Sequence, residues 1–257
     1  MLDDARVPRQ VAMTYPHLNR APIVEAVLDV AIAPVLEWRD DAFAAFSAAA
    51  QDEFPDAQPI MQFQAELTVD GTGAAAHSAA HEKLGYIYWN RDKTRAVQVR
   101  ANGFSVNQVR SYQDWDALLA HAKAWWPRYL QSVGASRIAR CGIRFINQFE
   151  ITPGEDLSLT LRTRPELSSG LPQELDEYFQ RMVVPFPGGA RAAITQVIPP
   201  LDELSQKRMF VLDIDVSVAA DMPASSDAMW STFADLREIK NRCFFESLQK
   251  TKWEEFL

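Results

Sequence analysis

One stretch just past the middle of the chain, RIARCGIRFINQFEI, constrains the fold most strongly because it alternates between apolar and polar residues. One side carries Cys141, Ile143, Phe145, Phe149 and Ile151, and the other carries Arg140, Arg144, Gln148 and Glu150. Successive side chains of a strand point to opposite faces of its sheet. The stretch therefore predicts a long strand over 137–151, with one face on a core and a polar face opposite.

Similar patterns predict the remaining elements of the chain. In the first half, the sequence predicts strands over 21–34, 60–69, 85–89, 94–100 and 104–110, a helix from Asp40 or Asp41 to residue 54, and a helix from its N-cap Asp114 to Gly134. Residues 70–82 are rich in Gly, Ala and Ser, which predicts a loop. In the second half, the sequence predicts strands over 137–151, 191–198 and 208–218, and helices over 172–182 and about 227–248.

This order of elements predicts an α+β fold. The strands outnumber the crossover helices, so we expect a mostly antiparallel curved sheet with helices on one face. Residues 1–20 read as an N-terminal arm, and 21–257 as a single globular domain. Within that domain the element order suggests two degenerate β-α-β(n)-α pseudo-repeats, 21–134 and 137–257. The arrangement resembles the helix-grip and TATA-binding-protein-like architectures, a likeness that carries no function.

Composition narrows the class of protein. The apolar fraction of 47% and the aromatic fraction of 11% provide a core and argue against disorder. The formal net charge of −8 disfavours non-specific nucleic-acid binding, because neutralising phosphates requires a clustered basic surface. The N-terminal MLDDARVPRQ has no apolar core, and no apolar run suits a bilayer, so we expect a cytoplasmic protein without membrane contact.

The chain carries four recognisable segments in order: LNRAPIVEAVLDV, VQVRANGFSVNQV, GIRFINQFEI and LREIKNRCFFESL. Together they resemble a bacterial family of sporadic distribution that has no functional name. The resemblance covers nearly the whole chain and implies a soluble bacterial protein. It implies no activity, cofactor or catalytic residue that can be carried over to positions of this sequence.

Motifs for catalysis or metal binding are weak. His77 and His81 stand four residues apart, but a zincin needs His-Glu-x-x-His and a third ligand, so an exposed loop is the better interpretation. Asp213 and Asp215 share one strand face, which suits Mg²⁺ or acid–base chemistry but equally an ordinary solvated face. The two cysteines, Cys141 and Cys243, read as buried thiols. The sequence has no G-x-S-x-G, Walker A or G-x-G-x-x-G motif, so no catalytic residue, metal or cofactor is assigned.

The last predicted helix carries a cationic and aromatic cluster. Arg237, Lys240, Asn241 and Arg242 fall within two turns, and Phe244 and Phe245 follow. Such a cluster suits an anion or an acidic segment of a partner. Basic residues near a helix C-terminus also simply complement the helix dipole, so a solvated surface is the alternative interpretation.

The polar faces of the predicted strands together form the other candidate surface. They gather Glu25, Asp29, Gln62, Gln64, Glu66, Gln98, Arg100, Arg140, Arg144, Gln148, Asp213 and Asp215. This amide-rich, mixed-sign set suits hydrogen-bonded recognition of a protein or polar ligand better than wrapping of a polyphosphate. A merely solvated face would look similar, although Lys would be common there and none is present in this set.

These patterns favour a non-catalytic binding or accessory protein that holds a protein or polar ligand on its polar sheet face. One alternative is a carboxylate-based, metal-dependent hydrolase or nuclease acting through Asp213, Asp215 and Glu25. Another is a nucleic-acid-binding module that uses the sheet arginines with the last helix. The candidate ligand- or partner-binding residues are Glu25, Arg100, Arg140, Arg144, Gln148, Asp213, Asp215, Arg237, Lys240 and Asn241.

The lack of a convincing ligand set predicts that folding is independent of metal. Adding EDTA should leave the melting temperature unchanged, because removing a structural metal would remove folding free energy. Thermal melts followed by circular dichroism, with and without EDTA, measure this directly. A clear drop would indicate a metal at His77 and His81 or at Asp213 and Asp215.

Overall fold

A computed structural model of the chain describes residues 15–34, 40–69, 75–172, 175–200 and 207–257, with the backbone alone for 40, 62–69 and 75–82. The strands are β1 Ile23–Ala33, β2 Asp56–Val69, β3 Ala75–Trp89, β4 Arg95–Arg100, β5 Gly103–Val109, β6 Arg137–Ile151, β7 Tyr178–Pro185, β8 Arg191–Ile198 and β9 Arg208–Pro223. The helices are α1 Asp40–Ala50, α2 Trp115–Val133, α3 Ala228–Ser247 and α4 Lys250–Glu254, with short 3₁₀ turns at Leu157–Leu159 and Pro187–Gly189. The α+β class is therefore confirmed.

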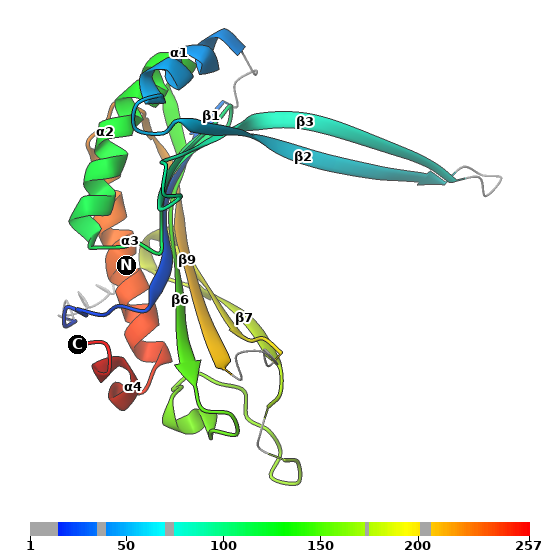
Figure 1. Ribbon diagram of the computed structural model, residues 1–257, viewed down its shortest axis with the longest axis vertical. Coiled ribbons are helices and arrows are strands. Elements are labelled where there is room, and N and C mark those ends of the chain that lie inside the picture. The colour runs from blue at the N-terminus through cyan, green and yellow to red at the C-terminus, as the bar shows by residue number, and fades with distance from the viewer. Residues whose placement is uncertain (1–14, 35–39, 70–74, 173–174, 201–206) are drawn as a thin grey trace, which may run out of the picture.

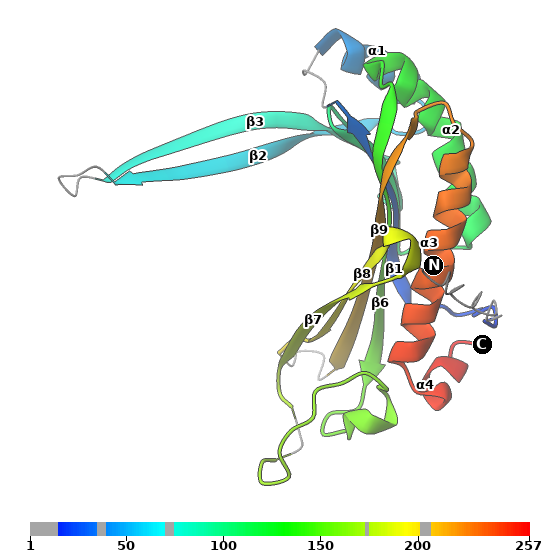
Figure 2. The ribbon, with the colours of Figure 1, turned by 180° about the vertical axis from the view of Figure 1, so that it is seen from behind.

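The strands form one nine-stranded sheet in the order β2-β3-β4-β5-β1-β6-β9-β8-β7, and every neighbouring pair is antiparallel. Helices α2 and α3 pack on one face of this curved sheet, α2 against β5 and β1 and α3 against β9 and β6. The β2–β3 hairpin projects from the other side, and β7 leans the same way at the opposite end (Figure 1, and from behind in Figure 2). The uncovered side of the sheet is therefore concave.

The two central strands, β1 and β6, pair in the middle of the sheet. Their register places Ala26 beside Phe145 on the helix side and Val27 beside Arg144 on the opposite side. From this pair the strand order runs outward through β5, β4, β3 and β2 in one direction and through β9, β8 and β7 in the other. Because the side-chain period of a strand is two, this register decides which residues enter the core.

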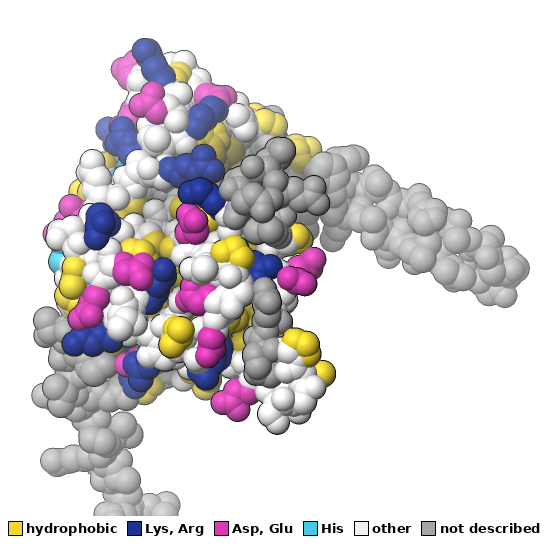
Figure 3. Space-filling model, turned by 60° about the horizontal axis from the view of Figure 1, so that its bottom comes forward, with side chains coloured by type: hydrophobic (Ala, Val, Ile, Leu, Met, Phe, Trp, Pro, Cys, Tyr) yellow, Lys and Arg dark blue, Asp and Glu magenta, His cyan; other side chains and the backbone are white. Residues whose placement is uncertain are grey.

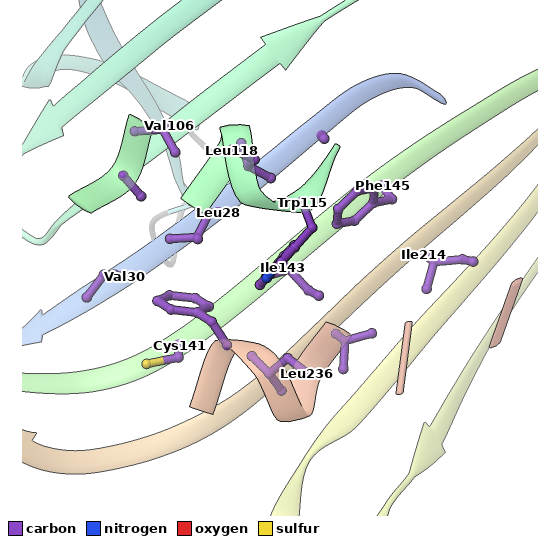
Figure 4. Packing of buried hydrophobic residues seen from close by; sticks show 14 of the residues in the cluster. Leu28, Val30, Val106, Trp115, Leu118, Cys141, Ile143, Phe145, Ile214 and Leu236 are labelled. Atoms are coloured by element: carbon purple, nitrogen blue, oxygen red, sulfur yellow. The ribbon is translucent and has the colours of Figure 1, made fainter. Parts of the chain in front are cut away.

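The apolar sides of these strands form the core against the helices. Leu28 and Phe145 have no exposed surface, and Ile143 is 1% exposed. Figure 4 shows these side chains beside Trp115 of α2 and Leu236 of α3. The apolar side of β6, read from the alternation, is the buried side, and the free thiols Cys141 and Cys243 are buried as expected.

Helix α2 begins and ends where its sequence predicts. The Asp114 side chain accepts a hydrogen bond from the Ala117 N–H at 2.7 Å, and so caps the first turn. At the other end Gly134 adopts φ 74°, and its N–H donates to the Leu130 carbonyl at 2.9 Å. This left-handed conformation favours glycine, which explains why the helix stops there.

Two predicted elements are wrong. The helix expected over 172–182 is absent from the described residues there, because strand β7 begins at Tyr178 and pairs with β8. Tyr178 and Met182 share one side of a strand as well as one face of a helix, so their spacing could not separate the two. The loop expected over 70–82 is also shorter than predicted, since 75–82 belong to β3 and pair with β2. Backbone pairing outweighs the weak strand propensity of that stretch.

The two-repeat organisation and the helix-grip or TATA-binding-protein likeness stay predictions. The second pseudo-repeat lacks its expected first long helix, because the described residues between β6 and β7 contain only a short 3₁₀ turn. Outward from the β1–β6 pair, the strands of the first half follow in the order β5, β4, β3 and β2, and those of the second half in the order β9, β8 and β7.

Part of the expected N-terminal arm is attached to the body. The Tyr15 ring stacks on Phe245 of α3 with centroids 4.6 Å apart, and the Arg20 N–H donates to the Phe256 carbonyl at 2.9 Å. Residues 1–14 lie outside the described residues. No helix in the described part of the chain combines the length and apolar character needed to cross a membrane.

Truncating the core residue Phe145 should be costly. Phe145→Ala should lower the free energy of unfolding by about 3–5 kcal/mol, because a fully buried Phe leaves a cavity. Phe179→Ala on edge strand β7, where Phe179 is 70% exposed, is the matched control and should change it by no more than about 0.5 kcal/mol. Urea unfolding of the three proteins gives the comparison. Equal midpoints for wild type and Phe145→Ala would show that the faces of β6 are reversed.

Candidate functional site

The concave side of the sheet, here called the open face, consists of the polar sides of β4, β5, β1, β6 and β9. It contains a shallow hollow of about 270 Å³. The polar side chains on the open face are Glu25, Asp29, Gln98, Arg100, Ser105, Asn107, Arg140, Arg144, Asp213 and Asp215. None of the helices in the described residues covers this side, as Figure 1 shows. Those sheet residues proposed from alternation whose side chains the structure describes therefore meet on one surface.

Asp29 of β1 is the centre of this surface. One of its carboxylate oxygens accepts from the Arg100 guanidinium at 2.6 Å, and the other accepts from Arg140 at 2.7 Å. The Asp29 and Arg100 side chains are 23% and 19% exposed, so this pair is partly shielded from water. One carboxylate thus holds Arg100 of β4 and Arg140 of β6, which lie on opposite sides of β1 in the sheet. The positions of both arginines are fixed before any ligand binds.

Arg144 of β6 forms the second ion pair. Its Nε and Nη2 atoms donate to both oxygens of Asp213 on β9, at 2.9 and 2.7 Å. This contact raises the pKa of Arg144 and keeps the guanidinium charged. The Arg144 side chain is nevertheless 49% exposed, and its Nη1 atom donates no hydrogen bond within the described residues. Arg144 therefore presents free donors to solvent while it stays anchored.

The remaining carboxylates of the open face are less fully paired. Asp215 lies 3.8 Å from Arg140 across β6 and β9, and burial, together with nearby carboxylates, raises its pKa. Glu25 accepts a hydrogen bond from Asn107 at 2.9 Å. Asp215 is thus the carboxylate on this face that a cationic group of a partner would stabilise most.

Sequence reasoning missed two buried polar residues of the open face, Ser105 and Asn107 on β5. They are 2% and 5% exposed, and Asn107 links Gln98 at 3.3 Å to Glu25. The signal was present, because both alternate with the buried Phe104 and Val106. Gln148 also lies on the open face, because it stands four residues after Arg144 on the exposed side of β6, whereas Gln62, Gln64 and Glu66 lie outside the described side chains.

The candidate residues of the last helix lie on the other face of the sheet. Arg237, Lys240 and Asn241 of α3 line a cavity of about 180 Å³ between α3, the start of α2 and the N-terminal segment, here called the α3 pocket. The Lys240 ammonium lies 4.4 Å from the centre of the Phe145 ring. Asn147 of β6, which is 2% exposed, also lines this pocket and was missed, although it occupies the core phase of the alternation.

This separation bears on the alternative functions. A nucleic acid on the arginines of the open face would not reach α3, because the sheet lies between them. Asp213 is held by Arg144, which leaves Asp215 and Glu25 as the carboxylates for metal chemistry. Among the described residues no three potential metal ligands come together, and His77 and His81 have no described side chains. Neither alternative therefore gains support from the geometry.

No protein-family model matches this chain, and a search of curated proteins finds no match either. The surfaces themselves therefore provide the evidence on function. Figure 3 shows Lys and Arg interspersed with Asp and Glu over the described surface seen from its lower end. This mixed pattern agrees with the balanced ion pairs of the open face.

Removing the charge of Asp29 should destabilise the protein. Asp29→Asn should lower the free energy of unfolding by about 1–3 kcal/mol, because it weakens two charged hydrogen bonds and removes the carboxylate that Arg100 and Arg140 share. Asp221→Asn is the matched control, since Asp221 also binds an arginine, Arg137, but is 83% exposed. It should cost about 1 kcal/mol or less. Equal losses in the two variants, measured by urea unfolding, would contradict a central role for Asp29.

Proposed function

We propose that this chain is a non-catalytic binding or accessory protein that holds a protein partner or a polar ligand on the open face. The observation that carries this proposal is the set of ion pairs that join β4 to β1, β1 to β6 and β6 to β9 on the concave open face. A cytoplasmic location remains a prediction from the sequence.

Preorganisation supports a binding role. Binding costs free energy when flexible side chains must be ordered, and arginine side chains lose much rotamer freedom. Asp29 and Asp213 already hold Arg100, Arg140 and Arg144 in place. These side chains are therefore already ordered in the folded protein, and a partner that binds this face loses little affinity to their conformational entropy.

The charge balance favours a protein or a mixed-charge polar ligand over a polyphosphate. The arginines Arg100, Arg140 and Arg144 face the carboxylates Asp29, Asp213, Asp215 and Glu25. Arginines that are already neutralised release few counterions on binding phosphate, so they provide little electrostatic affinity for nucleic acid. A partner with both basic and acidic groups would pair with Asp215 and with the free donors of Arg144.

Replacing Arg144 tests this proposal. Arg144→Ala should lower the free energy of unfolding by about 1 kcal/mol or less, because the pair with Asp213 is half exposed. The same substitution should abolish capture of the partner that immobilised wild-type protein retains from a lysate of the native host. Affinity purification with mass spectrometry, followed by titration of the purified partner, measures this loss.

Arg162→Ala provides the matched control. Arg162 is also 49% exposed and pairs with Glu246 at 2.8 Å, but Glu246 belongs to α3 on the other face. This variant should retain the partner with wild-type affinity. Full retention of the partner by Arg144→Ala, or equal loss in both variants, would remove the open face as the binding surface.

A further inference from the structure

The α3 pocket combines aromatic walls with two cations. The N-terminal segment, the segment before α2, and α3 each contribute to its lining, and Asn147 of β6 contributes from the sheet. Aromatic rings of Tyr15, Phe244 and Phe245 line it, with the Tyr15 and Phe245 rings stacked in parallel. Its volume of about 180 Å³ corresponds to roughly six water molecules at liquid density, so only a small ligand fits.

The two cations of the pocket have no carboxylate partner. Neither Arg237 nor Lys240 forms an ion pair with any acidic group in the described part of the chain, in contrast to the arginines of the open face. Each instead lies over an aromatic ring, Arg237 at 5.4 Å from the Trp115 ring centre and Lys240 at 4.4 Å from that of Phe145. The Arg237 charge disfavours the charged form of Lys240, and an anion between these two cations would relieve their repulsion.

Other polar groups of the pocket agree with this charge pattern. The pocket-lining Asp114 caps α2 through its side chain, which accepts from the Ala117 N–H, so that carboxylate is already engaged. Tyr15 also lines the pocket, and its hydroxyl is buried without a hydrogen-bond partner among the described residues.

We propose that the α3 pocket binds a small organic carboxylate with an aromatic or otherwise apolar body. The carboxylate lies at Lys240 and Arg237, and the body packs against the rings of Tyr15 and Phe244. This site lies behind the sheet and does not depend on the function proposed for the open face.

Binding at this site is coupled to a proton on Lys240. Burial, and secondly the nearby Arg237, lowers the pKa of Lys240 to about 7. A carboxylate in contact favours the ammonium and raises that pKa, so the complex takes up a proton. The titratable and charged groups around Lys240 and its pocket are Tyr15, His17, Tyr112, Asp114, Arg237, Glu238 and Cys243. Affinity should therefore fall as pH rises from about 7 to 9, approaching tenfold per pH unit at the upper end.

Benzoate is the probe, because it is a rigid aryl carboxylate that stays ionised over this pH range. Isothermal titration calorimetry of the full chain should give saturable benzoate binding with Kd on the order of 1 mM or tighter at pH 7. Benzamide, the neutral analogue of the same shape, lacks the charge contact and should bind at least about tenfold more weakly than benzoate. Inorganic phosphate is an anion without an apolar body. It lacks the ring contact and should also bind at least about tenfold more weakly.

Lys240→Met identifies the residue, because methionine fills similar space without a charge. This variant should lose at least about tenfold in benzoate affinity at pH 7 and lose the pH dependence between 7 and 9. Lys123→Met is the matched control, since Lys123 also lies over a ring, that of Trp230 at 5.5 Å, but does not line the pocket. It should bind benzoate as the wild type does. Thermal melts of both variants establish that they are folded, and Arg237→Gln provides a second variant with the same expected loss.

Several outcomes would overturn the proposal: no saturable benzoate binding, equal affinities for benzoate and benzamide, phosphate binding as tightly as benzoate, or unchanged benzoate affinity in folded Lys240→Met. A pH dependence that persists in Lys240→Met would assign the proton to another group and overturn the role given to Lys240. Loss of partner capture at the open face without change in benzoate binding would leave this proposal standing.

Discussion

The antiparallel pairing of β1 with β6 decides which side chains enter the core and which reach the open face. These strands lie in the middle of the sheet, and their register sends Leu28, Ile143 and Phe145 toward the helices. The same register sends Asp29, Arg140 and Arg144 to the opposite side. A shift by one residue would bury those charges and expose the apolar residues, at a cost that no other contact in the sheet could offset.

The polar side of this pairing is organised rather than merely solvated. Ion pairs between exposed groups contribute little to stability, so their number does not explain the fold. What distinguishes the open face is that a single carboxylate, Asp29, fixes two arginines and that Arg144 is bound through both oxygens of Asp213. These contacts cross from strand to strand and hold a shallow surface in one geometry, which is what selective recognition of a polar partner requires.

Much of this was predictable from sequence because period-two alternation is a direct consequence of strand geometry. Strands β6 and β8 have the predicted bounds, and the Asp114 and Gly134 caps of α2 were expected from their residue types. Strand β7 was mistaken for a helix because Tyr178 and Met182 fit both periods, and only pairing with β8 decides between them. The residues of both candidate surfaces were predicted, and the expectation of helices on one face of the sheet already separates Arg237 and Lys240 from Arg144. The sequence could not show the α3 pocket, because its lining also comes from the N-terminal segment and from Asn147. Asn147 was not predicted as a site residue, because a single polar residue on the apolar side of a strand does not by itself indicate a pocket.

Arginine footprinting measures whether the open face is the surface that contacts a partner. The protein is treated with an arginine-selective dicarbonyl reagent, alone and with its captured partner, and modification is measured by mass spectrometry. The account predicts that Arg140 and Arg144 lose reactivity in the complex, whereas the half-exposed Arg162, paired with Glu246 of α3, keeps its reactivity. Protection of Arg162 with unchanged reactivity at Arg140 and Arg144 would contradict it.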